Sequence, residues 1–257
     1  MLHYCALTTG SCGNCYLFYD GETTIAIDCG VTWKKFSTEM EMHSMPLSSL
    51  GAMFLTHLHP DHAKGVGAVQ RKTQVPVFVS STALRDGKTE MDKLKIERKL
   101  VFPFTWGTTV GVGKFDVTPF RTSHDSPGSS GYFIVNGNDK IFLMTDTGVI
   151  PEEAWGYAKV SSVKFIESNY DSDMLAHGPY PTWLKARVRG EYGHLSNDEA
   201  VNFAGETSGR GDQIYFIHLS DNNNDVGLLK DLVNKTIPSG IFCKVCERGE
   251  MFEGFTD

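Results

Sequence analysis

The sequence has no surplus of basic residues. It contains 24 Lys and Arg against 31 Asp and Glu, which gives a formal net charge of −7. A protein that holds nucleic acid or an anionic membrane over a broad surface needs an excess of positive charge there. The acidic balance therefore opposes binding of nucleic acid or an anionic membrane over a broad surface. It leaves open the local binding of a few phosphates at a site that metal ions make positive.

Long apolar runs are also missing. No stretch of about 18 apolar residues occurs, and the N-terminus has no basic segment followed by an apolar one. We therefore expect neither a membrane span nor a secretory signal, and we expect a cytoplasmic protein. Because no linker, repeat or low-complexity tract divides the chain, we expect a single domain, residues 1-257, whose core needs no obligatory protein partner.

Cysteine is sparse, with six residues. Two Cys-x-x-Cys pairs, Cys12 with Cys15 and Cys243 with Cys246, superficially match a four-thiolate zinc site. The second pair lies in an expected strand, where residues three apart face opposite ways. Small buried thiols that stay free in a reducing compartment are therefore the favoured interpretation.

Metal-ligand side chains are concentrated in one stretch, directly after a short apolar run. Residues 56 to 62 read Thr-His-Leu-His-Pro-Asp-His. Alternate side chains of an extended segment share a face, so His57 and His59 point together, and a turn at the proline lets Asp61 and His62 face a second position nearby. Imidazole and carboxylate ligands without thiolate fit zinc, with manganese or iron also allowed. The stretch predicts two neighbouring metal positions, the alternative being a chance polar loop.

This His-x-His-x-Asp-His run after a short strand resembles the metallo-β-lactamase superfamily of metal-dependent hydrolases. Over nearly the whole chain the sequence resembles one branch of it, the YycJ/WalJ-type proteins. That branch usually has His where Tyr170 stands. The motifs that carry the branch resemblance are the loop Thr9 to Asn14, Ile27-Asp28-Cys29-Gly30, Glu167-Ser168-Asn169, Gly193-His194-Leu195-Ser196-Asn197 and Ile217-His218-Leu219-Ser220.

The resemblance implies an α+β fold, a four-layer αββα sandwich, with two strand-rich halves at about 1-123 and 124-257. It also implies that further ligands stand at strand ends, with Asp146 bridging two metal ions. The expected metal ligands are His57, His59, Asp61, His62, His124, Asp146 and His218.

Sequence patterns predict the elements between these residues. Helices are expected at 33 to 49, from 61 to 70, at 82 to 86 and at 197 to 207, the last with a capping box formed by Ser196 and Glu199. Residues 87 to 99 mix basic and acidic side chains and are expected to form a solvated connection. Strands are expected at 4–7, 15–18, 24–28, 52–56, 75–80, 100–101, 108–111, 115–120, 132–135, 140–144, 163–171, 213–217 and 241–246.

Two divalent ions, zinc or else manganese or iron, held by these ligands would lower the pKa of a bridging water from about 15.7 toward ~7 and make hydroxide available at neutral pH. The same ions can hold a phosphodiester oxygen. Asp61 and His194 are the expected catalytic residues. His194 is the candidate proton donor to the leaving oxygen, or the holder of a nonbridging oxygen, because an imidazole pKa near ~6.5 keeps both protonation states available. Loop packing is the alternative for His194.

The branch resemblance favours a phosphodiesterase or nuclease, specifically a 5′-directed DNA exonuclease of the kind used in DNA repair. The same chemistry elsewhere in the superfamily leaves a small-molecule hydrolase open, acting on a cyclic phosphodiester, a lactone or a thioester. A non-catalytic metal-binding regulatory protein is the alternative of another class, although its complete ligand set would then have no use.

Contacts to the substrate are expected from a few polar side chains in the branch motifs. The cations after Tyr180-Pro181 are candidates for phosphate contacts, or else they only solvate a helix face, and the asparagine of the first loop either orients a ligand or caps its turn. The expected substrate contacts are Asn14, Asn169, Tyr170, Lys185 and Arg187, with Arg189 as a further cation.

Overall fold

The computed structural model describes residues 1–256 and has two seven-stranded mixed sheets packed against each other. The first sheet has the order β14-β1-β2-β3-β4-β5-β6 and the second the order β13-β12-β11-β10-β9-β8-β7. The strands of the first sheet are β1 (His3–Thr8), β2 (Cys15–Tyr19), β3 (Thr24–Ile27), β4 (Leu50–Phe54), β5 (Val77–Ser80), β6 (Val101–Phe104) and β14 (Phe252–Phe255). Those of the second are β7 (Val110–Val112), β8 (Phe115–Arg121), β9 (Ser130–Asn136), β10 (Asp139–Met144), β11 (Val163–Glu167), β12 (Gln213–Ile217) and β13 (Phe242–Val245).

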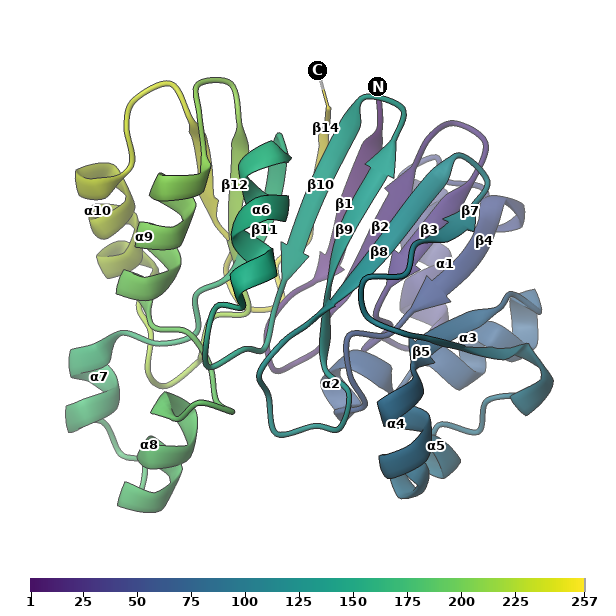
Figure 1. Cartoon of the computed structure of the whole chain (residues 1–257), viewed down its shortest axis with the longest axis horizontal. Helices are drawn as coiled ribbons and strands as arrows, with labels where there is room; N and C mark the ends of the chain where they lie inside the picture. Colours follow the sequence, from purple (N-terminus) through teal and green to yellow (C-terminus); the bar gives the residue numbers. More distant parts are fainter. Residues whose placement is uncertain (257) are drawn as a thin grey trace.

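Helices cover the outer face of each sheet. Figure 1 shows α6, α9 and α10 on one side of the two sheets and α1 and α3 on the other. The four-layer αββα sandwich is therefore confirmed. The helices are α1 (Trp33–Met42), α2 (Pro60–Ala63), α3 (Val66–Thr73), α4 (Ser81–Asp86), α5 (Lys88–Lys93), α6 (Glu152–Val160), α7 (Ser172–His177), α8 (Thr182–Arg189), α9 (Asn197–Thr207) and α10 (Val226–Thr236), with short 3-10 turns at Leu47–Ser49 and Arg98–Leu100.

Side-chain alternation along the strands explains this layering. In β1, Tyr4 and Ala6 belong to the apolar cluster between the sheets, whereas Cys5 and Leu7 belong to the cluster beneath α1 and α3. Both faces of such a strand are buried, so its sequence reads as a nearly continuous apolar run. Each large apolar side chain buried in this way stabilises the fold by roughly 1.5–3 kcal/mol.

The division of the chain between the sheets differs from the expected one. The first sheet ends at β6 and the second begins at β7, so the boundary lies between Phe104 and Val110 and not near residue 123. The last strand, β14, then returns to the first sheet and pairs antiparallel with β1. The prediction failed because β7 and β8 form a hairpin with each other before β9 joins them.

Two helix predictions and one predicted connection are also corrected. The helix expected at 33–49 ends at Met42, because Ser44 adopts a left-handed conformation with φ 56° and Pro46 follows. The helix expected from 61 is broken at Gly65, where a Cβ atom would lie 1.9 Å from the Val31 carbonyl oxygen. The expected connection 87–99 contains α5 and a 3-10 turn. The capping box of Ser196 and Glu199 is confirmed.

The carboxyl ends of the parallel strands meet at one edge of the molecule. Figure 1 shows α7 and α8 at this end and both termini at the opposite end. Three non-glycine residues adopt the left-handed conformation just after strands here: Asp28 (φ 61°), Asp146 (φ 52°) and His218 (φ 59°). Such strain is uncommon and collects at functional sites. Within residues 1–256, no helix has both the length and the apolar character that a membrane crossing requires.

Candidate metal centre and active site

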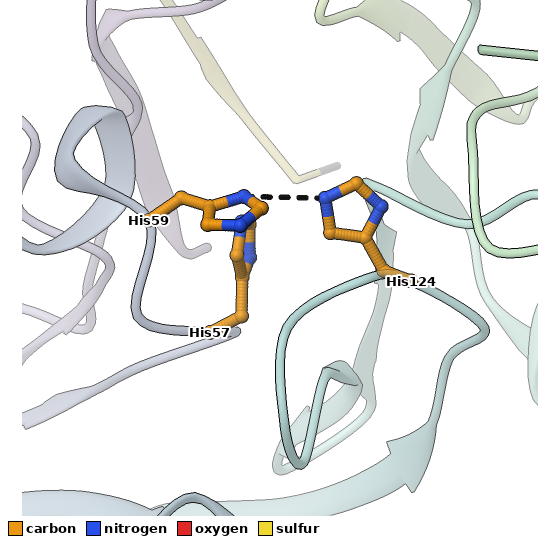
Figure 2. Close-up of side chains that lie close together, drawn as sticks. All are labelled: His57, His59 and His124. Carbon is orange, nitrogen blue, oxygen red and sulfur yellow. Dashed lines mark hydrogen bonds between the residues drawn. The ribbon is translucent and has the colours of Figure 1, made fainter. Parts of the chain in front are cut away.

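Three of the predicted ligand histidines form a compact group. Ligand-type atoms of His57, His59 and His124 lie within 4.8 Å of one another. Figure 2 shows the three rings converging, with His59 Nδ1 lying 3.3 Å from His124 Nε2. His57 and His59 come from the loop after β4 and His124 from the loop after β8, so two strand ends from different sheets build this group.

The remaining predicted ligands form a second group beside the first. Ligand-type atoms of Asp61, His62 and His218 also lie within 4.8 Å of one another. Asp146 lies between the groups: its Oδ2 is 3.2 Å from His62 Nε2, and its Oδ1 is 3.7 Å from His124 Nε2. The structure thus brings all seven predicted ligands together.

The protein holds one nitrogen of each of four histidines and leaves the other facing the shared space. The Nδ1 atoms lie 3.0 Å from Thr56 Oγ1 for His57, 2.6 Å from Asp28 Oδ2 for His62, 3.0 Å from the Gly193 carbonyl for His124, and 3.3 Å from Glu167 Oε1 for His218. Fixing one ring nitrogen sets the tautomer and orientation of a metal-ligating histidine.

A divalent metal ion fits these residues. The Nε2 atoms of His57 and His218 are buried, and within residues 1–256 neither has a hydrogen-bond partner. A buried polar atom without a partner costs free energy that coordination would recover. Burial also holds the pKa of His57 well below its usual value, so the ring is neutral, the form that binds a metal ion.

Two carboxylates at the centre carry the negative charge that a metal cation needs. Burial alone would raise the pKa of the Asp146 carboxyl, but His218 and His62 outweigh that effect and hold its pKa well below the usual range. Asp61 behaves in the same way: burial raises its pKa, but the nearby His218 and His62 together outweigh burial and lower it. Both carboxylates are therefore ionised at neutral pH and available as oxygen ligands.

Backbone contact holds the loops that carry these ligands. The Asn14 N–H donates to the Asp61 carbonyl oxygen at 2.7 Å, and the Gly30 N–H donates to the Asn14 carbonyl oxygen at 2.8 Å. A Cβ atom at Gly30 would lie 1.7 Å from the Asp61 carbonyl oxygen. Only glycine at position 30 permits this approach, which sets the place of Asp61.

His194 lies beside the seven predicted ligands and is held by Glu167. Its Nδ1 is 2.6 Å from Glu167 Oε1, and its ring centroid lies 5.0 Å from that of His124. Burial would lower the pKa of His194, but the charges of Glu167 and Asp146 outweigh burial and raise it. The imidazole therefore remains protonated to a higher pH than a free histidine.

A cavity of about 340 Å³ opens onto the centre. Its lining residues can be compared with the predicted substrate contacts. Asn169 and Arg187 line it, together with Asp61 and His194. Arg187, however, is paired with Asp125, at 2.6 Å from its Nε to Asp125 Oδ2.

Three other predicted contacts lie outside that lining. Tyr170 is buried in a small apolar cluster with Val188, and burial raises its pKa to about 12, so its phenol stays protonated. Lys185 donates from Nζ to the Ala176 carbonyl oxygen at 2.8 Å. Asn14 is buried, with its Nδ2 2.9 Å from His62 Nε2. None of the three lines the cavity, and their role as substrate contacts stays a prediction.

Two further carboxylates, Asp28 and Glu167, lie at the centre although they were not among the predicted site residues. Asp28 Oδ2 also accepts a hydrogen bond from Thr56 Oγ1 at 2.7 Å, besides holding His62. Glu167, completely buried at the end of β11, contacts both His194 and His218. The only signal in the sequence is an acidic residue at the carboxyl end of an apolar strand, within a branch motif.

Comparison with known proteins agrees with this geometry. A family model described as a β-lactamase superfamily domain matches residues 23–219. Exodeoxyribonuclease YycJ of Bacillus anthracis is 29% identical over 253 residues, 98% of this chain and 94% of the relative. Exodeoxyribonuclease WalJ of Streptococcus pneumoniae serotype 2 is 28% identical over 235 residues, 91% of this chain and 86% of the relative. The solved structure of the metallo-β-lactamase fold protein YhfI from Bacillus subtilis has a TM-score of 0.74 at 18% identity, covering 98% of this chain and 99% of that one.

Fold and site together define a metal-dependent hydrolase with the metallo-β-lactamase fold. The chain belongs to the β-lactamase superfamily. The resemblance to YycJ/WalJ-type proteins is confirmed over nearly the full length.

Proposed function

We propose that this protein is a dinuclear metal-dependent phosphodiesterase that degrades DNA from the 5′ end. The observation that carries the proposal is the Glu167–His194 pair beside the seven predicted ligands, because it supplies a proton donor separate from them. Cleavage of a phosphodiester leaves an alkoxide that needs such a proton. The near full-length similarity to proteins named exodeoxyribonuclease supports DNA as the substrate.

The predicted ligands divide between two metal positions. His57, His59 and His124 would hold one ion, and Asp61, His62 and His218 the other, with Asp146 shared between them. When bound, two divalent ions supply Lewis acidity that activates water at neutral pH and offsets charge on the phosphoryl oxygens. Zinc, manganese and iron all suit this mixture of imidazole and carboxylate.

The chain's own residues supply the proton transfers. With its Nδ1 bonded to Glu167, His194 has Nε2 left to protonate the leaving oxygen. Glu167 stabilises the imidazolium before transfer and fixes the ring orientation, as a carboxylate behind a catalytic histidine does. Asp61 lines the same cavity and is placed to accept a hydrogen bond from the attacking water.

The surface around the cavity suits a short length of single strand. Tyr180 and Leu184 line the cavity, and Trp183 between them in sequence is 69% exposed on α8. Exposed aromatic rings stack on unpaired bases irrespective of sequence. Base stacking beside a metal centre needs few cations, which agrees with a net charge of −7.

The decisive experiment offers several substrates to the metal-free protein after reconstitution with manganese, zinc or iron. DNA labelled at either end, RNA, a cyclic nucleotide and a lactone would be compared under the same conditions. We expect stepwise loss of the 5′ label from DNA. Turnover of only the cyclic nucleotide or the lactone would replace the proposal with a small-molecule hydrolase, and no turnover with any metal would favour a regulatory metal-binding protein.

A further inference from the structure

A second group of ligand-type side chains lies far from the candidate active site. His3 of β1, His43 at the end of α1 and Glu253 of β14 meet at the end of the molecule that carries the termini. His3 Nε2 and His43 Nδ1 each lie 2.8 Å from the same oxygen, Glu253 Oε2. The chain has nine histidines; six surround the predicted metal centre, and two of the other three meet here.

The positions of these rings are fixed by the fold. His3 stacks on Phe255 with ring centroids 4.4 Å apart, and the side chain of His43 is only 10% exposed. His43 Nε2 is buried and has no hydrogen-bond partner among residues 1–256; the nearest carboxylate oxygen, Glu39 Oε2, is 3.7 Å away. The ring nitrogen that would serve as the ligand is the other one, Nδ1, which faces Glu253.

The atoms converge as zinc ligands do. The ligand-type atoms of the three side chains lie within 4.8 Å of one another. Ligands at ~2.0–2.1 Å from a tetrahedral zinc ion are roughly 3.3 Å apart, so the observed 2.8 Å contacts need only small side-chain rotations to accept an ion. An open hollow of about 430 Å³, lined by these three residues and by Tyr19, Met42 and Ser44 among others, gives solvent access to the remaining coordination position.

We propose that His3, His43 and Glu253 form a third metal site that binds a zinc-type divalent cation and has a structural role. The ion joins three elements that the sequence separates widely: the first strand, the end of α1 and the last strand. Because β14 pairs with β1 alone at the edge of its sheet, the ion would hold in place an edge strand that has a single neighbouring strand. The proposal is independent of the reaction at the other end of the molecule.

Zinc stoichiometry tests the site. The full-length protein, His43→Gln and Glu253→Gln would be dialysed to equilibrium against buffered zinc and analysed for metal. Glutamine at position 43 keeps an N–H donor for Glu253 but removes the imidazole ligand. His177→Gln is the matched control, because His177 is an exposed histidine outside both groups. We expect wild type and His177→Gln to hold about one zinc more than the other two variants.

A second measurement distinguishes loss of the site from loss of the fold. Amide hydrogen exchange in β14 is expected to slow on addition of zinc in wild type and to stay unchanged in His43→Gln, while DNA cleavage is the same in both. Equal zinc content in all four proteins, or exchange in β14 that does not respond to zinc in wild type, would show that the cluster is only hydrogen bonded and would overturn the proposal.

Discussion

Arg187 and Asp125 form an ion pair in which Nε and Nη2 of the guanidinium lie 2.6 and 2.5 Å from Asp125 Oδ2. The other oxygen of Asp125 lies 3.4 Å from His124 Nε2 and 3.6 Å from His59 Nε2. The pair joins α8 to the loop that carries His124. Arg187 therefore contacts the metal centre indirectly, through Asp125. Its guanidinium is already paired and is not free to bind a phosphate group.

This pairing predicts different results for the two cations of α8. Arg187→Glu places a negative charge against Asp125, so we expect cleavage of both DNA and a small chromogenic phosphodiester to fall by about 10- to 100-fold, the usual effect of losing an outer partner of a metal site. Lys185→Glu, whose lysine contacts a backbone carbonyl outside the cavity, is expected to change neither rate by more than a few fold. If Arg187→Glu lost activity on DNA but not on the small phosphodiester, Arg187 would instead be assigned to substrate binding.

Metal content is expected to follow the division of the ligands between two positions. Asp146→Ala should lower occupancy of both ions, because Asp146 lies between the groups. His57→Ala should empty mainly one position and His218→Ala the other, because each removes one ligand of one group. Elemental analysis after dialysis measures this. If all three variants retained about two ions, the assignment of ligands would be wrong.

Removal of the His194 imidazole separates chemistry from metal binding. His194→Ala should keep both its metal content and its fold, and turnover should fall by ~10²-fold or more if the ring is a general acid. The rate on a phosphodiester with a very good leaving group should fall much less, because such a group needs no proton. Equal rates for the variant and the wild type on DNA would assign His194 to loop packing.

The pH profile tests the role of Glu167. Glu167 and Asp146 outweigh burial and raise the pKa of His194, so the acid form persists to higher pH and activity is lost as the pH rises through that pKa. Glu167→Gln removes one of these charges, and the alkaline limb of kcat should move to lower pH. The measurement is kcat against pH at saturating metal. An alkaline limb at the same pH in both proteins would exclude His194 as the titrating acid.

Asp28 is expected to set metal affinity through His62. Asp28→Asn keeps a hydrogen-bond acceptor and tolerates the left-handed backbone at this position, so the change removes mainly the charge. We expect affinity for the ion bound by His62 to fall by roughly 10- to 100-fold, measured by competition with a chelator. Asp116→Asn, at an exposed position on β8, is the control. Unaltered affinity in Asp28→Asn would mean that the negative charge of Asp28 does not contribute to metal binding.

The sequence predicted the parts of the centre whose chemistry demands several unusual side chains at short spacing. His57, His59, Asp61 and His62 were found because their density has no other simple explanation. His124, Asp146 and His218 followed from strand ends and the branch resemblance. The sandwich followed from the resemblance to the metallo-β-lactamase superfamily.

The contacts that hold the ligand side chains in place could not be predicted from the sequence, because each depends on a partner far along the chain. Asp28 contacts a histidine 34 positions away, and Arg187 pairs with a residue 62 positions away. A single carboxylate after a strand, or an arginine on a short helix, is ordinary in a sequence. Only the packing of loops from both sheets against one another shows which of these side chains reach the centre.

The pairing of β1 with β14 has a consequence for the order of synthesis. The outer edge of β1 is completed by β14, a strand that the ribosome makes much later. Until then β1 presents an unpaired row of backbone groups on one side, the kind of edge that recruits strands from other chains. A nascent chain is therefore exposed to aggregation through β1 until β14 emerges, and a variant without β14 would keep that exposed edge permanently.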